Sequence, residues 1–414
     1  MTSWLHQAAA RHPDRIAIEG PERRLTYAEL RDAAVRQAEV LRGQLRVALD
    51  QPPGADFVIA LHAGLEAGAA VVPIDLRLSA AEQEQRRAPV LDPSLARGVD
   101  GADVEVAVMH TSGSTAAPKP VVLTAGNFLA SALGSAVALG LDPAERWLCP
   151  MPLTHVGGLS IPIRSAIYAT TVVLHGRFDT EAVLNELMDP GRRITLVSLV
   201  PTMLSRLLDA GLQSPPGLRW ALLGGGPIAP GLLARAGDVG VPVAPTYGMT
   251  EACSQIATFG WPLPGVEVRV AEDGEEILVR GPIVSAGAVG EDGWLHTGDL
   301  GRFDDRARLE IIGRKSDTIV SGGENVAPAE VEAVLLEHPA VADAAVHART
   351  DPEWGEAVVA TVVLRDGAGA APEELRAHCA ARLAGFKVPK AVGFTDQLPR
   401  TASGKLLRRR LQGP

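Results

Sequence analysis

From residue 104 to residue 246, short runs of apolar and β-branched residues alternate with longer amphipathic runs. The short runs include VEVAVMH, RWLCPMP and ITLVSLV, and the longer ones include NFLASALGSAVAL and TEAVLNELM. This alternation is typical of βαβ units that build a largely parallel sheet. Ligands of such sheets bind beyond the carboxyl ends of the strands, so polar residues that directly follow the short runs are the first candidates for a site.

Beyond residue 262 the pattern changes to turn-rich strands such as GVEVRV and EEILVRG. After them, PAEVEAVLLEHPAVADAAVHART, GEAVVATVVL and PEELRAHCAARLA predict a helix, two strands and a helix. The fold class is therefore α/β: a large N-terminal domain of parallel-sheet βαβ units plus a β-rich subdomain, followed by a small C-terminal α+β domain. We place the domains at residues 1–314 and 315–414.

Composition and charge narrow the class of protein. Hydrophobic residues make up 46% and charged residues 21% of the 414 positions, which is typical of a globular protein and argues against disorder. The formal net charge of −10 gives no general attraction to nucleic acid or to an anionic membrane, so neither is an expected partner. An anionic ligand has to be met by a local group of cations.

The cysteines and the apolar tracts indicate the compartment. Cys149, Cys253 and Cys379 are scattered and form no C-x-x-C pair, so neither a disulfide framework nor a zinc site is expected. The apolar tract DFVIALHAGLEAGAAVVPI is interrupted by His62 and Glu66, and charges precede any apolar run at the N-terminus. We therefore expect neither secretion nor a membrane span, and a cytoplasmic location.

The stretch HTSGSTAAPK, residues 110–119, has the composition of a phosphate cradle. It follows the expected strand VEVAVMH and precedes the expected helix AGNFLASALG, although it lacks the G-x-x-x-x-G-K-[ST] order of a P-loop. An ordinary surface turn explains this loop almost as well when it is taken alone. The residues suited to a polyphosphate are Thr111, Ser112, Gly113, Ser114, Thr115 and Lys119.

A second polar stretch, TYGMTEACSQ, follows the apolar run VPVAP. Here Tyr247 and Gly248 are candidates to hold a base, Thr250 can donate to a phosphate, and Glu251 can ligate Mg²⁺, which favours one or two carboxylates plus phosphate oxygens. Simple strand-to-helix turns remain an alternative for this stretch and for LLGGGPIAP upstream. That upstream stretch offers backbone for a planar ligand at Gly224, Gly225 and Gly226.

Three charged residues near the C-terminal end complete the candidates. Asp299 in HTGDLG can accept hydrogen bonds from two vicinal hydroxyls, as a ribose offers, and Arg314 in GRKSD can add a second polar contact. Lys405 follows a glycine in LPRTASGKLLRRRL. Taken singly, Asp299 is well explained by an ordinary turn between strands, and composition alone places Lys405 in a solvated basic tail.

Six stretches in order resemble one family. TSGSTAAPK, PLTHVGGL, YGMTE, HTGDL, GRKSDTIVSGGENVAPAEVE and PRTASGK closely resemble motifs of the adenylate-forming superfamily, which comprises acyl-CoA ligases, luciferases and peptide-synthetase adenylation domains. The resemblance runs over essentially the whole chain. Residues 139–179 and TEACSQI are most similar to the o-succinylbenzoate–CoA ligases of menaquinone biosynthesis.

The resemblance implies a ligase that uses ATP, Mg²⁺ and coenzyme A on a small-molecule carboxylate. The carboxylate attacks the α-phosphorus of Mg·ATP to give an acyl-adenylate and pyrophosphate, and the thiol of coenzyme A then displaces AMP. By the same resemblance, Lys405 holds the reacting groups in the first step and His155 is a gate between acyl pocket and pantetheine tunnel. Thr250 and Glu251 complete the catalytic set.

In the family the small C-terminal domain is mobile between the two steps. The resemblance places the pivot at Ser316, where many relatives carry Asp or Lys, and places Gly322 and Gly323 on the face that replaces Lys405. The phosphate loop departs from the family at Ala116 and Pro120, where glycines are usual. We expect slower loop motion from these two changes before any loss of binding.

The substrate is predicted from one further cation. An o-succinylbenzoate ligase must meet a ring carboxylate, and Arg164, a few residues after His155, suits it, although a solvated helix face explains Arg164 equally well. The alternatives are another aryl- or acyl-CoA ligase, a domain serving a carrier protein, a catalytically silent nucleotide-binding relative and a luciferase-like oxygenase. The sequence leaves the oligomeric state open, with a homodimer as one alternative.

Overall fold

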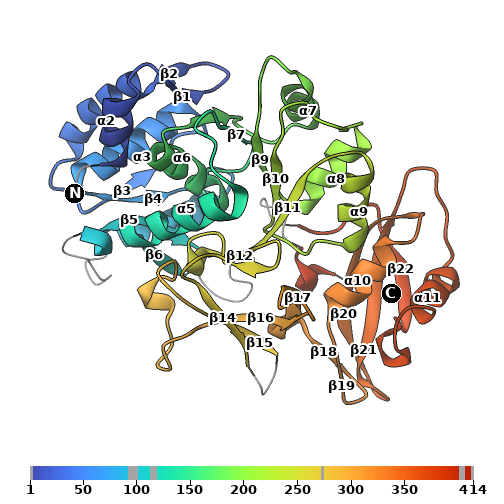
Figure 1. The fold of residues 1–414 in the computed structure, drawn as a ribbon. Coiled ribbons are helices and arrows are strands. Elements are labelled where there is room, and N and C mark those ends of the chain that lie inside the picture. The colour runs from blue at the N-terminus through green and yellow to red at the C-terminus, as the bar shows by residue number, and fades with distance from the viewer. Residues whose placement is uncertain (1–2, 92–100, 112–118, 272–274, 401–405, 412–414) are drawn as a thin grey trace. The chain divides into compact units, whose positions relative to one another are not determined.

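The computed structural model describes residues 3–91, 101–111, 119–271, 275–400 and 406–411 (Figure 1). Contacts divide the chain into two units. The first comprises Met1–Gly225, Ala236–Val268 and Val279–Leu295, and the second comprises Gly226–Arg235, Arg269–Leu278 and His296–Pro414. No helix among the described residues is both long and apolar enough to span a bilayer.

A nine-stranded sheet forms the centre of the first unit, in the order β13-β12-β11-β10-β9-β7-β8-β1-β2. The six strands from β11 to β1 in this order are parallel to one another, which confirms the predicted, largely parallel sheet. Apolar residues fill both faces, since every position of β8 and β9 is buried. The strands are β1 (Ile16–Glu19), β2 (Arg24–Thr26), β7 (Arg146–Cys149), β8 (Thr171–Leu174), β9 (Leu196–Leu199), β10 (Trp220–Leu223), β11 (Val243–Tyr247), β12 (Ala257–Thr258) and β13 (Trp261–Pro262).

Helices connect the parallel strands as βαβ units. Residues that favour a helix start lie at the N-termini of two of these helices. Asp179 caps α7 by accepting a hydrogen bond from Ala182 N at 2.9 Å, and Pro201 is the first residue of α8. The connecting helices are α6 (Val156–Tyr168), α7 (Thr180–Met188), α8 (Pro201–Asp209) and α9 (Pro230–Asp238).

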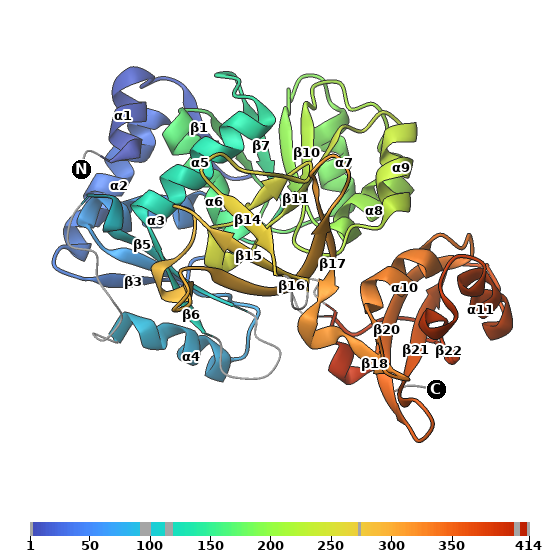
Figure 2. The ribbon, with the colours of Figure 1, turned by 60° about the horizontal axis from the view of Figure 1, so that its bottom comes forward.

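A second sheet lies in the first unit, in the order β3-β4-β5-β6, with α3 on one side and α4 on the other (Figure 2). Strands β3, β4 and β5 are parallel, whereas β6 is antiparallel to β5. The tract predicted to be apolar but not membrane-spanning forms α3 and β4, and most of it is buried. The elements are α1 (Trp4–Arg11), α2 (Tyr27–Leu41), β3 (Arg46–Leu49), α3 (Ala55–Ala67), β4 (Ala70–Pro73), α4 (Ala80–Leu91), η1 (Gly101–Asp103), β5 (Glu105–His110), β6 (Pro120–Thr124) and α5 (Ala125–Leu139).

The predicted helix AGNFLASALG is present as α5, but a strand that the sequence pattern did not predict lies between it and the 110–119 loop. Strand β6 comes first and closes a hairpin on β5, and α5 begins only at Ala125 with Thr124 as its N-cap. Pro120 opens β6 at the edge of the sheet, where a residue without an N–H is tolerated.

The predicted β-rich region beyond residue 262 is a four-stranded sheet in the order β14-β15-β16-β17. The C-terminal module then follows as the predicted helix, two strands and helix, which are α10, β20, β21 and α11. Short strands that the pattern did not predict complete its sheet. The elements are β14 (Glu267–Val270), β15 (Glu276–Arg280), β16 (Leu295–Phe303), β17 (Leu309–Arg314), β18 (Ile319–Ser321), β19 (Glu324–Val326), α10 (Pro328–Leu336), β20 (Val341–Asp351), β21 (Gly355–Leu364), α11 (Pro372–Ala380) and β22 (Ala391–Phe394).

Candidate active site

Helix α6 begins at the residue expected to gate the acyl pocket. His155 is its N-cap, and Nε2 of His155 is buried with no hydrogen bond to a described residue. Burial lowers the pKa of His155, and Arg77 and Arg86 lower it further against the opposing charge of Asp75. The imidazole is therefore neutral at pH 7 and has a nitrogen available for a ligand.

Arg164, on the same helix, faces the interior of the first unit. Its side chain is among the largest fully enclosed ones, its Nη2 donates to Ser131 Oγ at 2.9 Å, and its guanidinium carbon lies 5.9 Å from the centre of the Trp147 ring. Nε is buried, and no hydrogen bond joins it to the described part of the chain. The alternative of a solvated helix face is therefore wrong, and an enclosed cation of this kind suits an anionic ligand.

Other polar residues near His155 were not singled out from the sequence. Asp75 and Arg77 follow β4 and are joined by hydrogen bonds of 2.8 Å from Nε to Oδ1 and 2.6 Å from Nη2 to Oδ2. Arg86 of α4 and His110 at the end of β5 have buried nitrogens without a hydrogen bond to any described residue. Burial, with the charge of Arg86, lowers the pKa of His110 to about 4. Asp75, Arg77 and His110 lie at the ends of apolar strand runs, which marks an edge of a sheet but not which strands are neighbours, whereas Arg86 lies within α4 and has no such signal.

The described ends of the 110–119 loop lie at the base of the β5–β6 hairpin. Thr111 N donates to Lys119 O at 3.2 Å, and Lys119 is exposed. Other residues predicted for phosphate binding, together with the substituted position in the loop, lie outside the described residues; they are Ser112, Gly113, Ser114, Thr115 and Ala116.

The turn after β11 depends on glycine. A Cβ on Gly248 would lie 1.6 Å from Ser254 O, so no other residue fits there. Thr250 and Glu251 form the short 3₁₀ turn η2 (Thr250–Ala252), and Glu251 O accepts a hydrogen bond from Ser285 N at 2.8 Å. Tyr247, Thr250 and Glu251 are all half-buried, so each side chain in this turn is partly open to solvent.

The glycines after β10 are explained in part by packing. A Cβ on Gly224 would lie 2.8 Å from Thr246 Cγ2 and 2.9 Å from Thr246 O, so the close approach of β10 and β11 requires glycine. Gly225 has a φ of +78°, which also favours glycine, and both Gly225 and Gly226 are exposed.

Glu251 is the metal ligand that the sequence predicts. No group of three or more His, Cys, Asp or Glu side chains that could hold an ion is found where the chain is described. Glu251 is half-buried. One carboxylate completed by phosphate oxygens is a set that Mg²⁺ accepts, so these residues fit an ion that arrives with a nucleotide.

In the second unit, Asp299 of β16 and Arg314 of β17 lie opposite each other in register. Arg314 Nε donates to Asp299 Oδ1 at 2.8 Å, and the Asp299 side chain is 8% exposed against 46% for Arg314. The sequence predicted both residues, and the structure brings them together as an ion pair at one edge of the carboxylate.

The C-terminal module holds the predicted pivot and the glycine pair. Ser316 lies in η4 (Lys315–Asp317). Gly322 and Gly323, with φ of +61° and +87°, make the two-residue turn between β18 and β19, and a Cβ on Gly322 would lie 2.8 Å from Trp354 Cε3. Lys405 lies outside the described residues.

The sequence matches two family models. The model described as AMP-binding enzyme matches residues 5–90 and 92–291, and the one described as AMP-binding enzyme C-terminal domain matches residues 330–405. The chain belongs to the AMP-binding enzyme family.

Relatives of this AMP-binding enzyme are similar to it over essentially the whole length of both chains. A 2-succinylbenzoate–CoA ligase of Bacillus licheniformis is 39% identical, covering 99% of this chain and 99% of its own, and one of Bacillus cereus is 38% identical over 100% and 98%. The o-succinylbenzoate CoA synthetase of Bacillus subtilis, in complex with its acyl-adenylate intermediate, superposes with a TM-score of 0.89 at 36% identity over 100% and 98% of the two chains.

The same Bacillus subtilis enzyme in complex with ATP and magnesium ion gives a TM-score of 0.87 at 36% identity, covering 99% of each chain. ATP-bound MatB from Rhodopseudomonas palustris gives 0.86 at 25% identity over 98% and 97%. The predicted superfamily and the predicted fold class are both confirmed.

Proposed function

We propose that this AMP-binding enzyme is a 2-succinylbenzoate–CoA ligase that acts in menaquinone biosynthesis. The observation that carries the proposal is the full-length similarity to named 2-succinylbenzoate–CoA ligases, at 39% identity over 99% of both chains for one of them. The enzyme takes ATP, Mg²⁺ and coenzyme A, with 2-succinylbenzoate as the acid to be activated.

The reaction has two displacement steps. A succinyl carboxylate oxygen attacks the α-phosphorus of ATP, and the bond from that phosphorus to the bridging oxygen breaks, so pyrophosphate leaves. The sulfur of coenzyme A then attacks the acyl carbon, the thiol proton is lost, and the bond from that carbon to the AMP oxygen breaks. A carboxylate is already ionised at neutral pH, so positioning and stabilisation of developing charge dominate the first step.

In the first unit we assign the acyl end to α6. Arg164 binds the ring carboxylate, because it is buried with a nitrogen that no described residue satisfies. His155 separates the acyl pocket from the path of the coenzyme A thiol.

The nucleotide end of the first unit lies in its turns and loops. Thr250 donates to a phosphate, and Glu251 holds Mg²⁺, which neutralises phosphate charge when bound. The adenine rests near Tyr247 and Gly248 and against the backbone of Gly224 and Gly225; Gly226, which belongs to the second unit, remains a candidate for the same ligand. The β- and γ-phosphates are held by Thr111, Ser112, Gly113, Ser114, Thr115 and Lys119.

In the second unit we assign Asp299 to the ribose hydroxyls and Arg314 to the orientation of that carboxylate, which it contacts at 2.8 Å. Lys405 contacts the carboxylate and α-phosphate in the first step, Ser316 is the pivot of a C-terminal domain that begins at residue 315, and Gly322 and Gly323 serve the second step. We also propose a cytoplasmic location, because all three cysteines are free.

A thioester assay tests the proposal. The enzyme is incubated with Mg·ATP, coenzyme A and one acid at a time: 2-succinylbenzoate, benzoate or a short fatty acid. The products are identified by mass spectrometry. We expect selective formation of 2-succinylbenzoyl-CoA. Conversion of benzoate or fatty acids in its place would keep the chemistry and overturn the substrate, and no product from any acid would favour a silent nucleotide-binding relative.

A further inference from the structure

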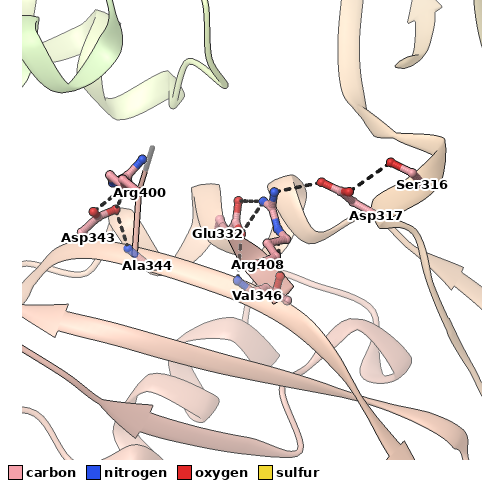
Figure 3. Close-up of polar contacts among 8 residues, drawn as sticks. All are labelled: Ser316, Asp317, Glu332, Asp343, Ala344, Val346, Arg400 and Arg408. Atoms are coloured by element: carbon pink, nitrogen blue, oxygen red, sulfur yellow. Dashed lines mark hydrogen bonds and ion pairs between the residues drawn. The ribbon is translucent and has the colours of Figure 1, made fainter. Parts of the chain in front are cut away.

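The guanidinium of Arg408 joins three elements of the second unit (Figure 3). Nη1 donates to Asp317 Oδ2 at 2.9 Å, and Nη2 donates to Glu332 Oε1 at 2.7 Å and Oε2 at 2.8 Å. Nε donates to Val346 O at 3.1 Å. One side chain close to the end of the chain therefore holds η4, α10 and β20 together through a planar fork that lysine cannot reproduce.

Glu332 is the fixed partner of Arg408. Its residue is 7% exposed on α10, and Oε1 also accepts a hydrogen bond from Val346 N at 2.7 Å. Burial raises the pKa of Glu332, and the charge of Arg408 opposes that effect. A buried carboxylate with these bonds anchors the Arg408 side chain to the core of the module.

Asp317 is the more exposed of the two carboxylates that Arg408 contacts. It ends η4, and its second carboxylate oxygen accepts a hydrogen bond from Ser316 Oγ at 3.1 Å. Its side chain is 30% exposed, against 10% for Glu332. The bond between Arg408 and Asp317 therefore ties the predicted pivot to the C-terminal end of the chain without contributing to the α10–β20 core.

A second arginine holds the chain on the other side of residues 401–405. Arg400 Nη2 donates to both carboxylate oxygens of Asp343, at 2.9 and 2.7 Å (Figure 3). Arg400 is also bridged to Leu406, and Leu407 N donates to Pro399 O at 2.8 Å. The described residues on both sides of the segment that includes Lys405 are thus attached to one body.

We infer that Arg408 is a positioning residue for the adenylation step. Through its bond to Asp317 it holds η6 beside η4, which contains the pivot Ser316. The inference rests on the proposed function, in which Lys405 serves the first step and not the second. Loss of the Arg408–Asp317 bond then lowers adenylation selectively. A contact that only stabilised the module would affect both steps alike.

The substitution Asp317→Asn tests this inference, since it removes the charge at the pivot and leaves Arg408 paired with Glu332. Adenylation is measured as pyrophosphate release from Mg·ATP and 2-succinylbenzoate without coenzyme A. The second step is measured as thioester formation from supplied 2-succinylbenzoyl-adenylate and coenzyme A. We expect adenylation to fall roughly tenfold, as for loss of a charge-assisted hydrogen bond, with the second step unchanged.

Arg408→Lys is the second variant, because it keeps a charge beside Glu332 but cannot reach three partners. It should also lower adenylation more than the second step, and the double variant should be no worse than Arg408→Lys alone, since the Asp317 contact is already lost in that variant. Arg410→Ala, exposed on the same turn η6 (Arg408–Arg410), is the control and should leave both steps unchanged.

Equal loss in the two steps, or no loss in either, would overturn the inference. If the unsubstituted enzyme makes no adenylate from 2-succinylbenzoate, the proposed substrate fails instead. The same comparison of steps, run with the acid that the enzyme does activate and with the adenylate of that acid, then decides the role of Arg408.

Discussion

At the scale of single residues, Arg164 is held by a neutral partner, Ser131, at 2.9 Å and by the face of Trp147. Burial lowers the pKa of Arg164, since a charged side chain is disfavoured away from water. A ligand carboxylate would supply the missing counter-charge and satisfy Nε. The proposed role of Arg164 therefore links substrate choice to the charge of this one side chain.

Replacement of Arg164 by Met keeps the volume and removes the charge. We predict that kcat/KM for 2-succinylbenzoate falls roughly 100-fold, as for truncation of a buried charge pair. The rate for 4-oxo-4-phenylbutanoate, which lacks the ring carboxylate, should stay the same. Thermal stability should not fall, because an apolar side chain suits a buried site. Steady-state kinetics with both acids check this, and parallel losses for the two acids would contradict it.

His62 makes stability depend on pH. It is fully buried on α3, and burial lowers its pKa to about 4, below the value of 6.5 for an exposed histidine. The unfolded chain therefore binds a proton below pH 6.5 that the folded chain refuses until about pH 4. The stability that neutral His62 contributes is present above pH 6.5 and is lost as the pH falls toward 4.

We predict that His62 alone lowers the free energy of unfolding by about 2 kcal/mol between pH 7 and pH 5. Urea unfolding at both pH values gives the slope of the unfolding free energy against pH. The difference in this slope between the unsubstituted chain and His62→Gln measures the contribution of His62. His12→Gln, at a half-buried histidine, is the control and should keep the original slope. Equal pH dependence in His62→Gln and the unsubstituted chain would refute the prediction.

Some site residues could be predicted from the sequence because their chemistry is local. Gly248, where a side chain does not fit, and the Asp299–Arg314 ion pair lie in short polar stretches that the sequence singles out, while their roles toward a ligand stay predictions. Asp75 and His110 could not be predicted in this way, because their proximity depends on β4 and β5 being neighbours in one sheet. Strand order is set by packing over the whole unit and leaves no mark on either short run.

At the scale of elements, the hairpin of β5 and β6 shows where the pattern misleads. The five-residue run PVVLT lies between a polar loop and a strong helix pattern, so the sequence pattern did not predict it as a strand. It is a strand because it pairs with β5. Strands β18 and β19 have three residues each and β22 has four, too few to show a period. Strands β20 and β21, with eleven and ten residues, and the nine-residue α10 were predictable because their apolar runs are longer.

The turn after β11 has no room for a side chain at Gly248. Gly248→Ala places a Cβ 1.6 Å from Ser254 O, so the turn must move. We expect a loss of about 4 kcal/mol or more in unfolding free energy, with loss of adenylation, because Thr250 and Glu251 shift with the turn. Calorimetry and pyrophosphate release measure the two effects.

Gly237→Ala is the matched control for that turn. An added Cβ at Gly237, near the end of α9, meets no atom within 4 Å. Stability there should stay equal or rise slightly, because alanine is a better helix former than glycine. A Gly248→Ala chain as stable and active as the Gly237→Ala chain would refute the structural role of the turn.

At the scale of the whole molecule, the C-terminal module has a core of its own. The buried cluster runs from Ile319 to Val392 and packs α10 and α11 against the β20–β21 strands. A domain with a separate core can fold alone. The proposed boundary at residue 315 can therefore be tested without the rest of the chain.

We predict that a chain of residues 315–414 expressed alone unfolds cooperatively in urea. The reason is that every member of its buried cluster lies within these residues. Circular dichroism followed through the transition checks this, and a chain of residues 1–314 serves as the comparison. A gradual, non-cooperative loss of signal from the 315–414 chain would place the boundary elsewhere.

The measurement that tests the ligase chemistry most directly is a two-stage single turnover. Enzyme is mixed with Mg·ATP and 2-succinylbenzoate, quenched and analysed by mass, and coenzyme A is then added to a parallel sample. We predict 2-succinylbenzoyl-adenylate and pyrophosphate in the first stage, and thioester and AMP in the second. Release of ADP and phosphate, or thioester formation without a preceding adenylate, would contradict it.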